Sequence, residues 1–186
     1  LKSAIPPQRP WPPIQGSTGG QGLPNRRPPD ALPPVRVMPA SSLLPAGLPP
    51  QDYARAFLAP LGATLDEPGI VLDVIGERLV VGKELFQKPD GQWKADKRER
   101  GPFMPLLARA LSDPDEIWAR VEWHYAQKKA IVRRRYIARF EIEGQDAPAL
   151  VVFDLGDDGW QGTTAFHGRE QEPDEWRIGV RLYKRP

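Results

Sequence analysis

The clearest pattern of hydrophobic and polar positions covers residues 131–142, whose sequence is IVRRRYIARFEI. Neighbouring residues of a strand point to opposite faces, so this segment predicts a strand with two different faces. One face is apolar except for Arg134, and carries Val132, Tyr136, Ala138, Phe140 and Ile142. The other face carries three arginines among other residues, in the order Ile131, Arg133, Arg135, Ile137, Arg139 and Glu141. The apolar face predicts burial against a core, and the arginine face is either a row of groups for binding phosphate or an ordinary solvated surface.

Two helices are predicted before this strand, together with the start of a third. Residues 52–59 form a short amphipathic pattern that a proline ends. Residues 103–111 repeat apolar side chains at helical spacing. Asp113, Pro114 and Glu116 have the spacing of a helix N-cap, a first helical residue and a capping-box acid. A third helix is therefore predicted to begin at Asp113.

The remaining elements are predicted to be strands. Short apolar runs at residues 70–75 and 79–81 flank a turn at Gly76-Glu77, and Asp157-Asp158-Gly159 is typical of a hairpin turn. The further predicted strands are residues 121–125, 130–142, 150–155, 160–167 and 179–183. Helices followed by a run of strands predict an α+β fold, with N-terminal helices packed on a small antiparallel sheet.

The first 50 residues have a different composition from the rest. They hold 14 of the 23 prolines, and a glycine-rich run occupies residues 16–22. Such a segment has little apolar surface to bury. We therefore expect residues 1–49 to be a disordered linker or tether, and residues 50–186 to form the folded domain. The chain begins with a leucine, which suggests a piece of a longer polypeptide.

Composition and charge exclude several classes of protein. The chain has no cysteine, so disulfides, zinc–thiolate sites and a cysteine nucleophile are excluded. No apolar run reaches the roughly 18 residues of a membrane span, so we expect no membrane contact. Residues 83–139 hold fourteen basic against eight acidic side chains, whereas residues 140–186 hold five against ten. The basic centre predicts an anionic partner, although a net charge of only +2 makes this signal weak.

The ionisable residues favour chemistry that needs no metal or other cofactor. The two histidines, His124 and His167, lie 43 residues apart and lack the spacing of metal ligands. RNA can be cleaved through its own 2′-hydroxyl, so a protein need supply only a base, an acid and cations. The candidates are the cations Lys97, Arg98, Arg100, Arg133, Arg135 and Arg139, the base or acid His124, and the hydrogen-bond donors Thr163 and Thr164.

These candidates also have purely structural interpretations. Residues 94–100 alternate in charge, which is equally typical of a solvated loop. His124 is also compatible with a half-buried histidine whose hydrogen bonds are satisfied by its neighbours. Alternation from Trp160 places Thr163 rather than Thr164 on the arginine face, unless a bulge interrupts the strand.

Six blocks of sequence, in a fixed order, carry a resemblance to a known family. They are Asp73-x-x-Gly-Glu-Arg-Leu-Val, Lys83-Glu-Leu-Phe, Lys97-Arg-x-Arg, Asp113-Pro-Asp-Glu-Ile-Trp, Arg133-Arg-Arg-Tyr-Ile-Ala-Arg-Phe and Gly159-Trp-x-Gly-x-Thr-x-Phe. Over about residues 40–185, this order resembles the phage-type members of the barnase–EndoU–colicin–RelE-like nuclease superfamily. Such domains occur in phage Mu-like head-morphogenesis proteins and in polymorphic toxins. Residues 174–183 depart from the family pattern, because an acidic sequence stands where a Tyr-Leu pair is expected.

The resemblance implies a metal-independent endoribonuclease with an α+β fold and no cofactor. Its substrate would be RNA, including tRNA. Its partners would be phage capsid or portal proteins and a cognate immunity protein, and its location a phage virion or a bacterial cytoplasm. On the matching positions, the resemblance implies catalytic roles for Lys97, Arg100, His124, Arg135, Arg139 and Thr164. We expect Arg98, Arg133, Tyr136 and Thr163 beside them as substrate contacts.

Two other functions remain open. An inactive domain that binds nucleic acid, or docks on a capsid protein, would give binding that weakens steeply with salt but no cleavage products. A DNase would need a divalent metal and carboxylate ligands, and the sequence offers no recognisable cluster of these.

Overall fold

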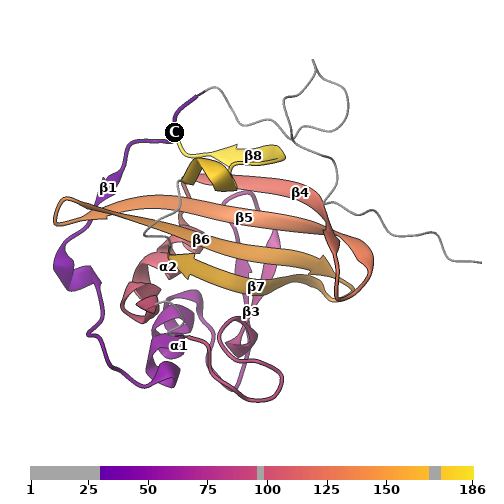
Figure 1. Ribbon diagram of the computed structural model, residues 1–186, viewed down its shortest axis with the longest axis horizontal. Coiled ribbons are helices and arrows are strands. Elements are labelled where there is room, and N and C mark those ends of the chain that lie inside the picture. The colour runs from indigo at the N-terminus through magenta and orange to yellow at the C-terminus, as the bar shows by residue number, and fades with distance from the viewer. Residues whose placement is uncertain (1–29, 96–98, 168–172) are drawn as a thin grey trace, which may run out of the picture.

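In the computed structural model, two helices cover one face of a curled sheet (Figure 1). The structure describes residues 30–95, 99–167 and 173–186. The helices are α1 (Pro50–Leu58) and α2 (Met104–Ser112). The strands are β1 (Arg36–Val37), β2 (Gly69–Leu72), β3 (Arg78–Val81), β4 (Glu116–His124), β5 (Lys129–Ile142), β6 (Gln145–Gly156), β7 (Gly159–His167) and β8 (Val180–Lys184). Short 3₁₀ helices are η1 (Ala40–Ser42), η2 (Ala59–Leu61), η3 (Lys83–Leu85), η5 (Gly101–Phe103) and η6 (Pro173–Trp176).

The sheet is mixed and larger than the small antiparallel sheet that the sequence predicted. Its strand order is β2-β3-β7-β6-β5-β4-β8, and β1 lies beside β5. The strands from β4 to β7 form an antiparallel meander, whereas β3 joins β7 and β1 joins β5 in parallel. The α+β class is confirmed. The helices are not all N-terminal, however, because β2 and β3 lie between α1 and α2 in the chain.

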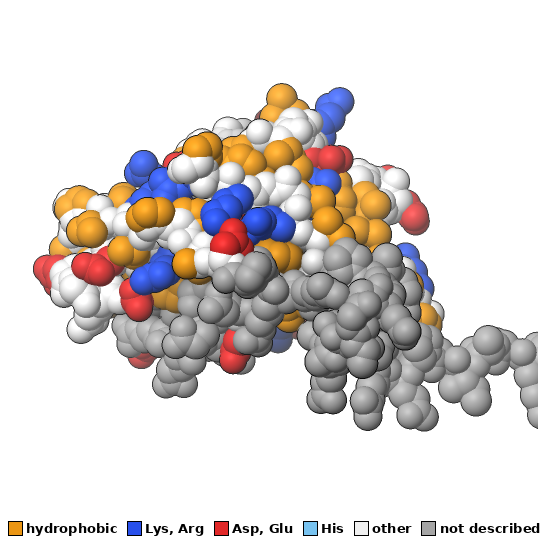
Figure 2. Space-filling view, turned by 90° about the horizontal axis from the view of Figure 1, so that it is seen from above, with side chains coloured by type: hydrophobic (Ala, Val, Ile, Leu, Met, Phe, Trp, Pro, Cys, Tyr) orange, Lys and Arg blue, Asp and Glu red, His pale blue; other side chains and the backbone are white. Residues whose placement is uncertain are grey.

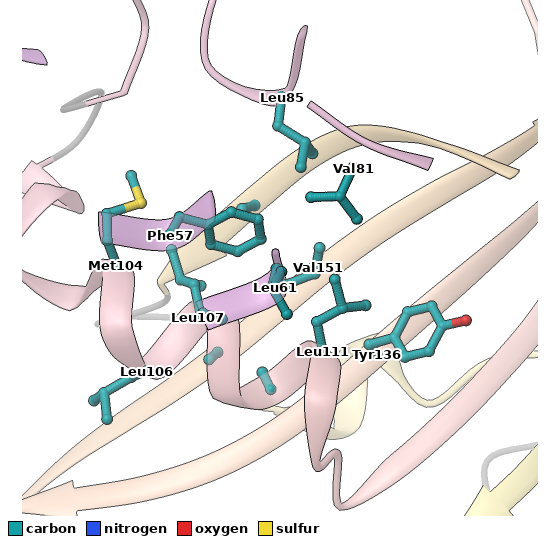
Figure 3. Close-up of a cluster of buried hydrophobic side chains, with 14 of the residues drawn as sticks. Phe57, Leu61, Val81, Leu85, Met104, Leu106, Leu107, Leu111, Tyr136 and Val151 are labelled. Atoms are coloured by element: carbon teal, nitrogen blue, oxygen red, sulfur yellow. The ribbon is translucent and has the colours of Figure 1, made fainter. Parts of the chain in front are cut away.

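The apolar face of β5 lies under the helices, as its alternation predicted. Tyr136, Ala138 and Phe140 are fully buried in the main core. Side chains of both helices, such as Phe57 and Leu107, point toward the strands, and the hydroxyl of Tyr136 points away from the cluster (Figure 3). Burying each large apolar side chain contributes about 1.5–3 kcal/mol to the stability of the fold. This layer therefore fixes which face of the sheet packs against the helices and which face can carry a functional site.

The helix predicted to begin at Asp113 is wrong, because a strand begins three residues later. Asp115 donates its backbone N–H to the carbonyl of Ile137, and β4 then pairs with β5 along its whole length. Asp115 and Glu116 are fully buried and bind arginines from distant segments instead of capping a helix. Tertiary partners therefore decide a region that local spacing alone assigns to a helix.

The described part of the proline-rich segment packs on the domain rather than extending away from it. β1 pairs with the end of β5 at Arg36 and Val37, and Met38, Leu43, Leu44 and Leu48 pack against the main core. The hydroxyl of Tyr53 donates to the carbonyl of Pro45 at 2.7 Å. Residues 30–49 are therefore part of the folded unit, and the rest of the predicted linker, 1–29, lies outside the described residues.

A candidate active site on the open sheet face

The face of the sheet opposite the helices, called the open face here, receives the arginine side of β5. The register sets Arg133 between Arg120 of β4 and Asp154 of β6, and sets Arg135 between Trp118 and Val152. Directly paired residues point to the same side of a sheet. The open face therefore carries charged side chains from three adjacent strands at one level.

Glu122 lies at the centre of this arrangement. One carboxylate oxygen of Glu122 accepts from Nη1 of Arg133 at 3.0 Å, and the other accepts from Nη2 of Arg135 at 2.5 Å. Arg133 also donates Nε and Nη2 to the two oxygens of Asp154, at 2.7 and 3.0 Å. This hydrogen bonding, chiefly with Asp154, raises the pKa of Arg133 above its usual value. We call Arg120, Glu122, Arg133, Arg135 and Asp154 the open-face cluster.

The open-face cluster holds three guanidinium groups against two carboxylates, and two of its buried donor atoms have no acceptor among the described residues. Nε of Arg120 and Nη1 of Arg135 are buried, and neither has a hydrogen-bond partner among the residues that the structure describes. Burial lowers the pKa of Arg120, as does the nearby charge of Arg135, against the opposing effect of Glu122. Buried donors without acceptors are costly, so these two N–H groups are the unsatisfied part of the open-face cluster.

His124 stands two residues after Glu122 on β4 and is half-buried. Its Nδ1 accepts a hydrogen bond from the backbone N–H of Gln127 at 3.1 Å. This contact assigns the neutral tautomer that carries its proton on Nε2. His124 therefore presents an N–H donor at the end of the strand that carries Glu122.

The structure does not bring Arg139 to the open-face cluster. Ile137 separates Arg139 from Arg135 along β5, and it is buried in a small apolar cluster on the open face. The members of that cluster are Trp118, Ile137, Leu150, Val152 and Trp176. Arg139 has its Nε 3.9 Å from the carboxylate of Asp146, and its side chain is 38% exposed. Arg135 and Arg139, which the sequence predicted to act in one active site, are therefore separated by apolar side chains.

Two other predicted site residues form hydrogen bonds inside the protein. Arg100 is buried and donates to the backbone carbonyls of Lys94, Ala95 and Ala165, which fastens its loop to β7. Tyr136 is fully buried on the helix side, where its hydroxyl donates to Asp73 at 2.6 Å. Burial, followed by the neighbouring carboxylate, raises the pKa of that hydroxyl far above its usual value. The structure therefore places Arg100, predicted as catalytic, and Tyr136, predicted as a substrate contact, away from the open-face cluster.

Several residues of the family-like blocks meet beside Tyr136 instead. Asp73 accepts from the backbone N–H of Glu77, and Glu77 accepts from the indole N–H of Trp160 at 3.1 Å. The guanidinium of Arg134 lies 4.4 Å from the ring of Trp160 and forms ion pairs with Asp73 and Glu77. This network explains why Arg134 interrupts the apolar face of β5: it ties the β2–β3 turn to the sheet.

A bulge in β7 determines how Thr163 and Thr164 lie opposite β6. The register pairs Thr164 with Val152 and Gly162 with Phe153, so Thr163 is the extra residue. The hydroxyl of Thr163 donates to the carbonyl of Val152 at 3.0 Å. The backbone register thus places Thr164 opposite Val152, which pairs with Arg135, whereas the side chain of Thr164 lies outside the described part of the chain. Lys97 and Arg98 also lie outside the described residues.

The first described segment, from residue 30, and the last described segment converge on the start of β4. Glu116 accepts from Nε and Nη2 of Arg177 at 2.8 and 2.9 Å, and Asp115 accepts from Nε of Arg185 at 2.9 Å. From the N-terminal side, Arg36 reaches Asp115 at 3.2 Å, and Asp30 pairs with basic side chains that follow η6. We call these residues the terminal staple: Asp30, Arg36, Asp115, Glu116, Arg177, Arg181, Lys184 and Arg185. Figure 2 looks onto the side where β8 lies, and it shows basic side chains beside acidic ones rather than an unbroken basic surface.

Acid is expected to release Asp30 from the terminal staple. Hydrogen bonds from Lys184 and then Arg181 lower the pKa of Asp30 to about 2. A carboxylate in an unfolded chain has a pKa of about 3.9, so the contact stabilises the docked segment above about pH 4 and is lost as the pH falls toward 2. The protection of the backbone amides of residues 30–36 against hydrogen exchange, taken relative to the intrinsic rate at each pH, is expected to fall between pH 5 and pH 2. Asp30→Asn should show the low protection already at pH 5, and an unchanged transition in that variant would contradict this assignment.

Three cluster residues did not emerge as candidates from the sequence: Arg120, Glu122 and Asp154. The signal for Glu122 was available, because alternation from His124 places both residues on one face of the predicted strand 121–125. Arg120 and Asp154 become significant only through the register of β4 and β6 with β5, which the sequence does not specify. Across the described ranges, no helix is long and apolar enough to cross a membrane.

Comparison with known proteins gives one match. The family described as phage-Barnase-EndoU-ColicinE5/D-RelE like nuclease2 matches residues 56–184, which is more than half of the chain. No curated protein and no solved structure matches the chain. The matched range begins in α1 and includes every member of the open-face cluster.

Proposed function

The chain belongs to the phage-Barnase-EndoU-ColicinE5/D-RelE like nuclease2 family, and on this premise we propose that it is a metal-independent endoribonuclease that acts through the open-face cluster. One observation carries the proposal: the carboxylate of Glu122 is held between the guanidinium groups of Arg133 and Arg135, and among the described residues two buried donors of the same cluster, Nε of Arg120 and Nη1 of Arg135, have no acceptor. Phosphodiester transfer through a 2′-hydroxyl requires a general base and nearby cations that can stabilise the charge on the phosphate oxygens, and the open-face cluster contains both.

The proposed reaction forms one bond and breaks one at phosphorus. Glu122 takes the proton of the 2′-hydroxyl, and the 2′ oxygen attacks the adjacent phosphorus. The bond to the 5′ oxygen of the next nucleotide breaks, and this oxygen takes a proton from water while Nε2–H of His124 donates a hydrogen bond to it. Arg135 and Arg120 neutralise the charge that develops on the phosphate oxygens. The products are a 2′,3′-cyclic phosphate and a 5′-hydroxyl, and Glu122 returns its proton to water.

The biological setting is part of the proposal. The word phage in the family description supports a phage setting, so we propose a domain of a phage head protein or of a delivered toxin. RNA such as tRNA is its substrate, and a capsid, portal or immunity protein is its partner, in a virion or a bacterial cytoplasm. Lys97, Arg98 and Thr164 remain proposed contributors, since their side chains lie outside the described residues.

A defined RNA tests the reaction directly. The purified protein in excess EDTA is expected to cleave a short single-stranded RNA and leave a cyclic phosphate, which mass spectrometry identifies. The same oligonucleotide with one 2′-deoxy nucleotide at the cleavage position is expected to remain intact, because it lacks the nucleophile. Cleavage of the deoxy substrate, or cleavage that chelation abolishes, would overturn the proposal.

The pairing of Glu122 favours a second candidate, a domain that binds nucleic acid without cutting it. Both carboxylate oxygens of Glu122 already accept hydrogen bonds from arginines, so the proposed base is engaged within the protein. This candidate predicts binding of RNA or DNA that weakens steeply between low and physiological salt, with no products after long incubation. The EDTA assay separates the two functions.

A further inference from the structure

Asp154 on β6 makes a two-point contact that an ordinary surface carboxylate lacks. Its Oδ1 accepts from Nε of Arg133 at 2.7 Å, and its Oδ2 accepts from Nη2 at 3.0 Å. The two side chains are only 14% and 25% exposed. Two parallel hydrogen bonds from one edge of a guanidinium fix its plane as well as its position, so Asp154 determines the orientation of Arg133.

The third nitrogen of the same guanidinium, Nη1 of Arg133, links the oriented group to Glu122. Nη1 of Arg133 donates to one oxygen of Glu122 at 3.0 Å, while Arg135 holds the other oxygen at 2.5 Å. The hydrogen-bonded series Asp154–Arg133–Glu122–Arg135 therefore crosses β6, β5 and β4. Each carboxylate oxygen of Glu122 has a fixed donor, so the rotamer of this side chain depends on both arginines.

We propose that Asp154 is a positioning residue that holds Arg133 so that the carboxylate of Glu122 keeps its orientation toward the 2′-hydroxyl of the substrate. The inference rests on the proposed function and adds a residue that acts on the base through another side chain. Without Asp154, Arg133 has a single anchor and gains rotamer freedom, and the base loses a fixed donor. A misplaced base lowers the rate of the chemical step, whereas substrate affinity depends on the donors of Arg120 and Arg135.

The chain offers a matched control for this proposal. Asp146 lies on the same strand and the same face as Asp154, and its side chain is 67% exposed. Its nearest cation is Arg139 at 3.9 Å, beyond the apolar cluster that contains Ile137. Asp146→Asn therefore removes the same charge from the same strand without touching the series that reaches Glu122.

Steady-state kinetics on the RNA oligonucleotide test the proposal. Asp154→Asn keeps the side-chain volume but replaces one acceptor with a donor, and it is expected to lower kcat about 10-fold or more. KM is expected to change by less than about twofold, and Asp146→Asn to match the wild type. In an E122Q background, the change at Asp154 should have no further effect, because the base that it orients is gone. Wild-type kinetics for D154N, a raised KM at constant kcat, or an additive loss in the double variant would overturn the proposal.

A measurement that needs no cleavage separates this inference from the proposed function. The Nε–H of Arg133 is held by Asp154, so its ¹⁵N–¹H signal is expected to exchange slowly in the wild type and in D146N, and to broaden or vanish in D154N. An unchanged signal in D154N overturns the positioning itself. Absence of RNA cleavage by the wild type overturns the proposed function and the catalytic consequence, whatever this signal shows.

Discussion

Replacing Glu122 with glutamine is expected to reduce kcat for RNA cleavage by about 10²–10⁴-fold, the range over which general-base catalysis contributes. Glutamine has nearly the same shape and still accepts a hydrogen bond, but its amide cannot take the proton of the 2′-hydroxyl. KM is not expected to rise, because the substitution removes a negative charge beside the phosphate. Single-turnover cleavage in EDTA measures the chemical step without interference from product release.

The control for this variant is Glu143→Gln, which makes the same chemical change in the exposed turn between β5 and β6. It is expected to cleave at the wild-type rate. Thermal melting of E122Q should show whether the fold is kept, since Arg133 and Arg135 lose an anionic partner. A folded E122Q protein that cleaves like the wild type would show that this carboxylate is not the base and that the site has been misplaced.

The second large effect is expected in stability. Glu116 is fully buried and forms a two-point ion pair with Arg177, whose side chain is 3% exposed, while it also accepts from the indole of Trp118. Glu116→Gln removes the buried carboxylate that makes two hydrogen bonds to this guanidinium, whereas Asp30, at 3.6 Å, is a more distant anionic partner. Breaking a buried pair in this way costs about 3–5 kcal/mol in the free energy of unfolding. For a chain of this size, that corresponds to a Tm lower by roughly 6–20 °C.

An exposed ion pair provides the comparison. Asp52 and Arg55 are 2.8 Å apart on the surface of α1, and both side chains are about half exposed. Asp52→Asn is expected to change the free energy of unfolding by less than about 0.5 kcal/mol. Urea denaturation of both variants measures the difference. Equal midpoints for E116Q and the wild type would contradict a stabilising role for the terminal staple.

The strand that carries the arginines was predictable because its alternation is strong. The burial of Tyr136, Ala138 and Phe140 on one face follows directly from a period of two and an apolar majority. The start of β4 was not predictable, because Asp113, Pro114 and Glu116 have the local spacing of a helix cap. Asp115 and Glu116 are instead buried against arginines more than 60 residues away, and a local sequence pattern contains no information about such distant partners.

The candidate site was predictable only in part, for a related physical reason. The arginines of β5 could be named from their own strand, but their partner Glu122 depends on how β4 pairs with β5. The same alternation could not show that Ile137 is covered by an apolar cluster, which separates Arg139 from Arg135. Arg100 was predicted as a site residue because it lies in a run of charged residues, but its guanidinium donates hydrogen bonds to backbone carbonyls in the interior. Charge in a sequence does not reveal whether a side chain faces water or the protein.

The attachment of residues 30–49 decides where the protein can be trimmed for laboratory work. A fragment that starts at residue 50 would lack β1, the apolar contacts of Met38 and Leu44, and one of the two guanidinium groups that reach Asp115. Loss of activity in such a shortened protein would then reflect a damaged scaffold and say nothing about catalysis. A cut just before Asp30 keeps all of these contacts, so it is the sounder starting point for expression and crystallisation.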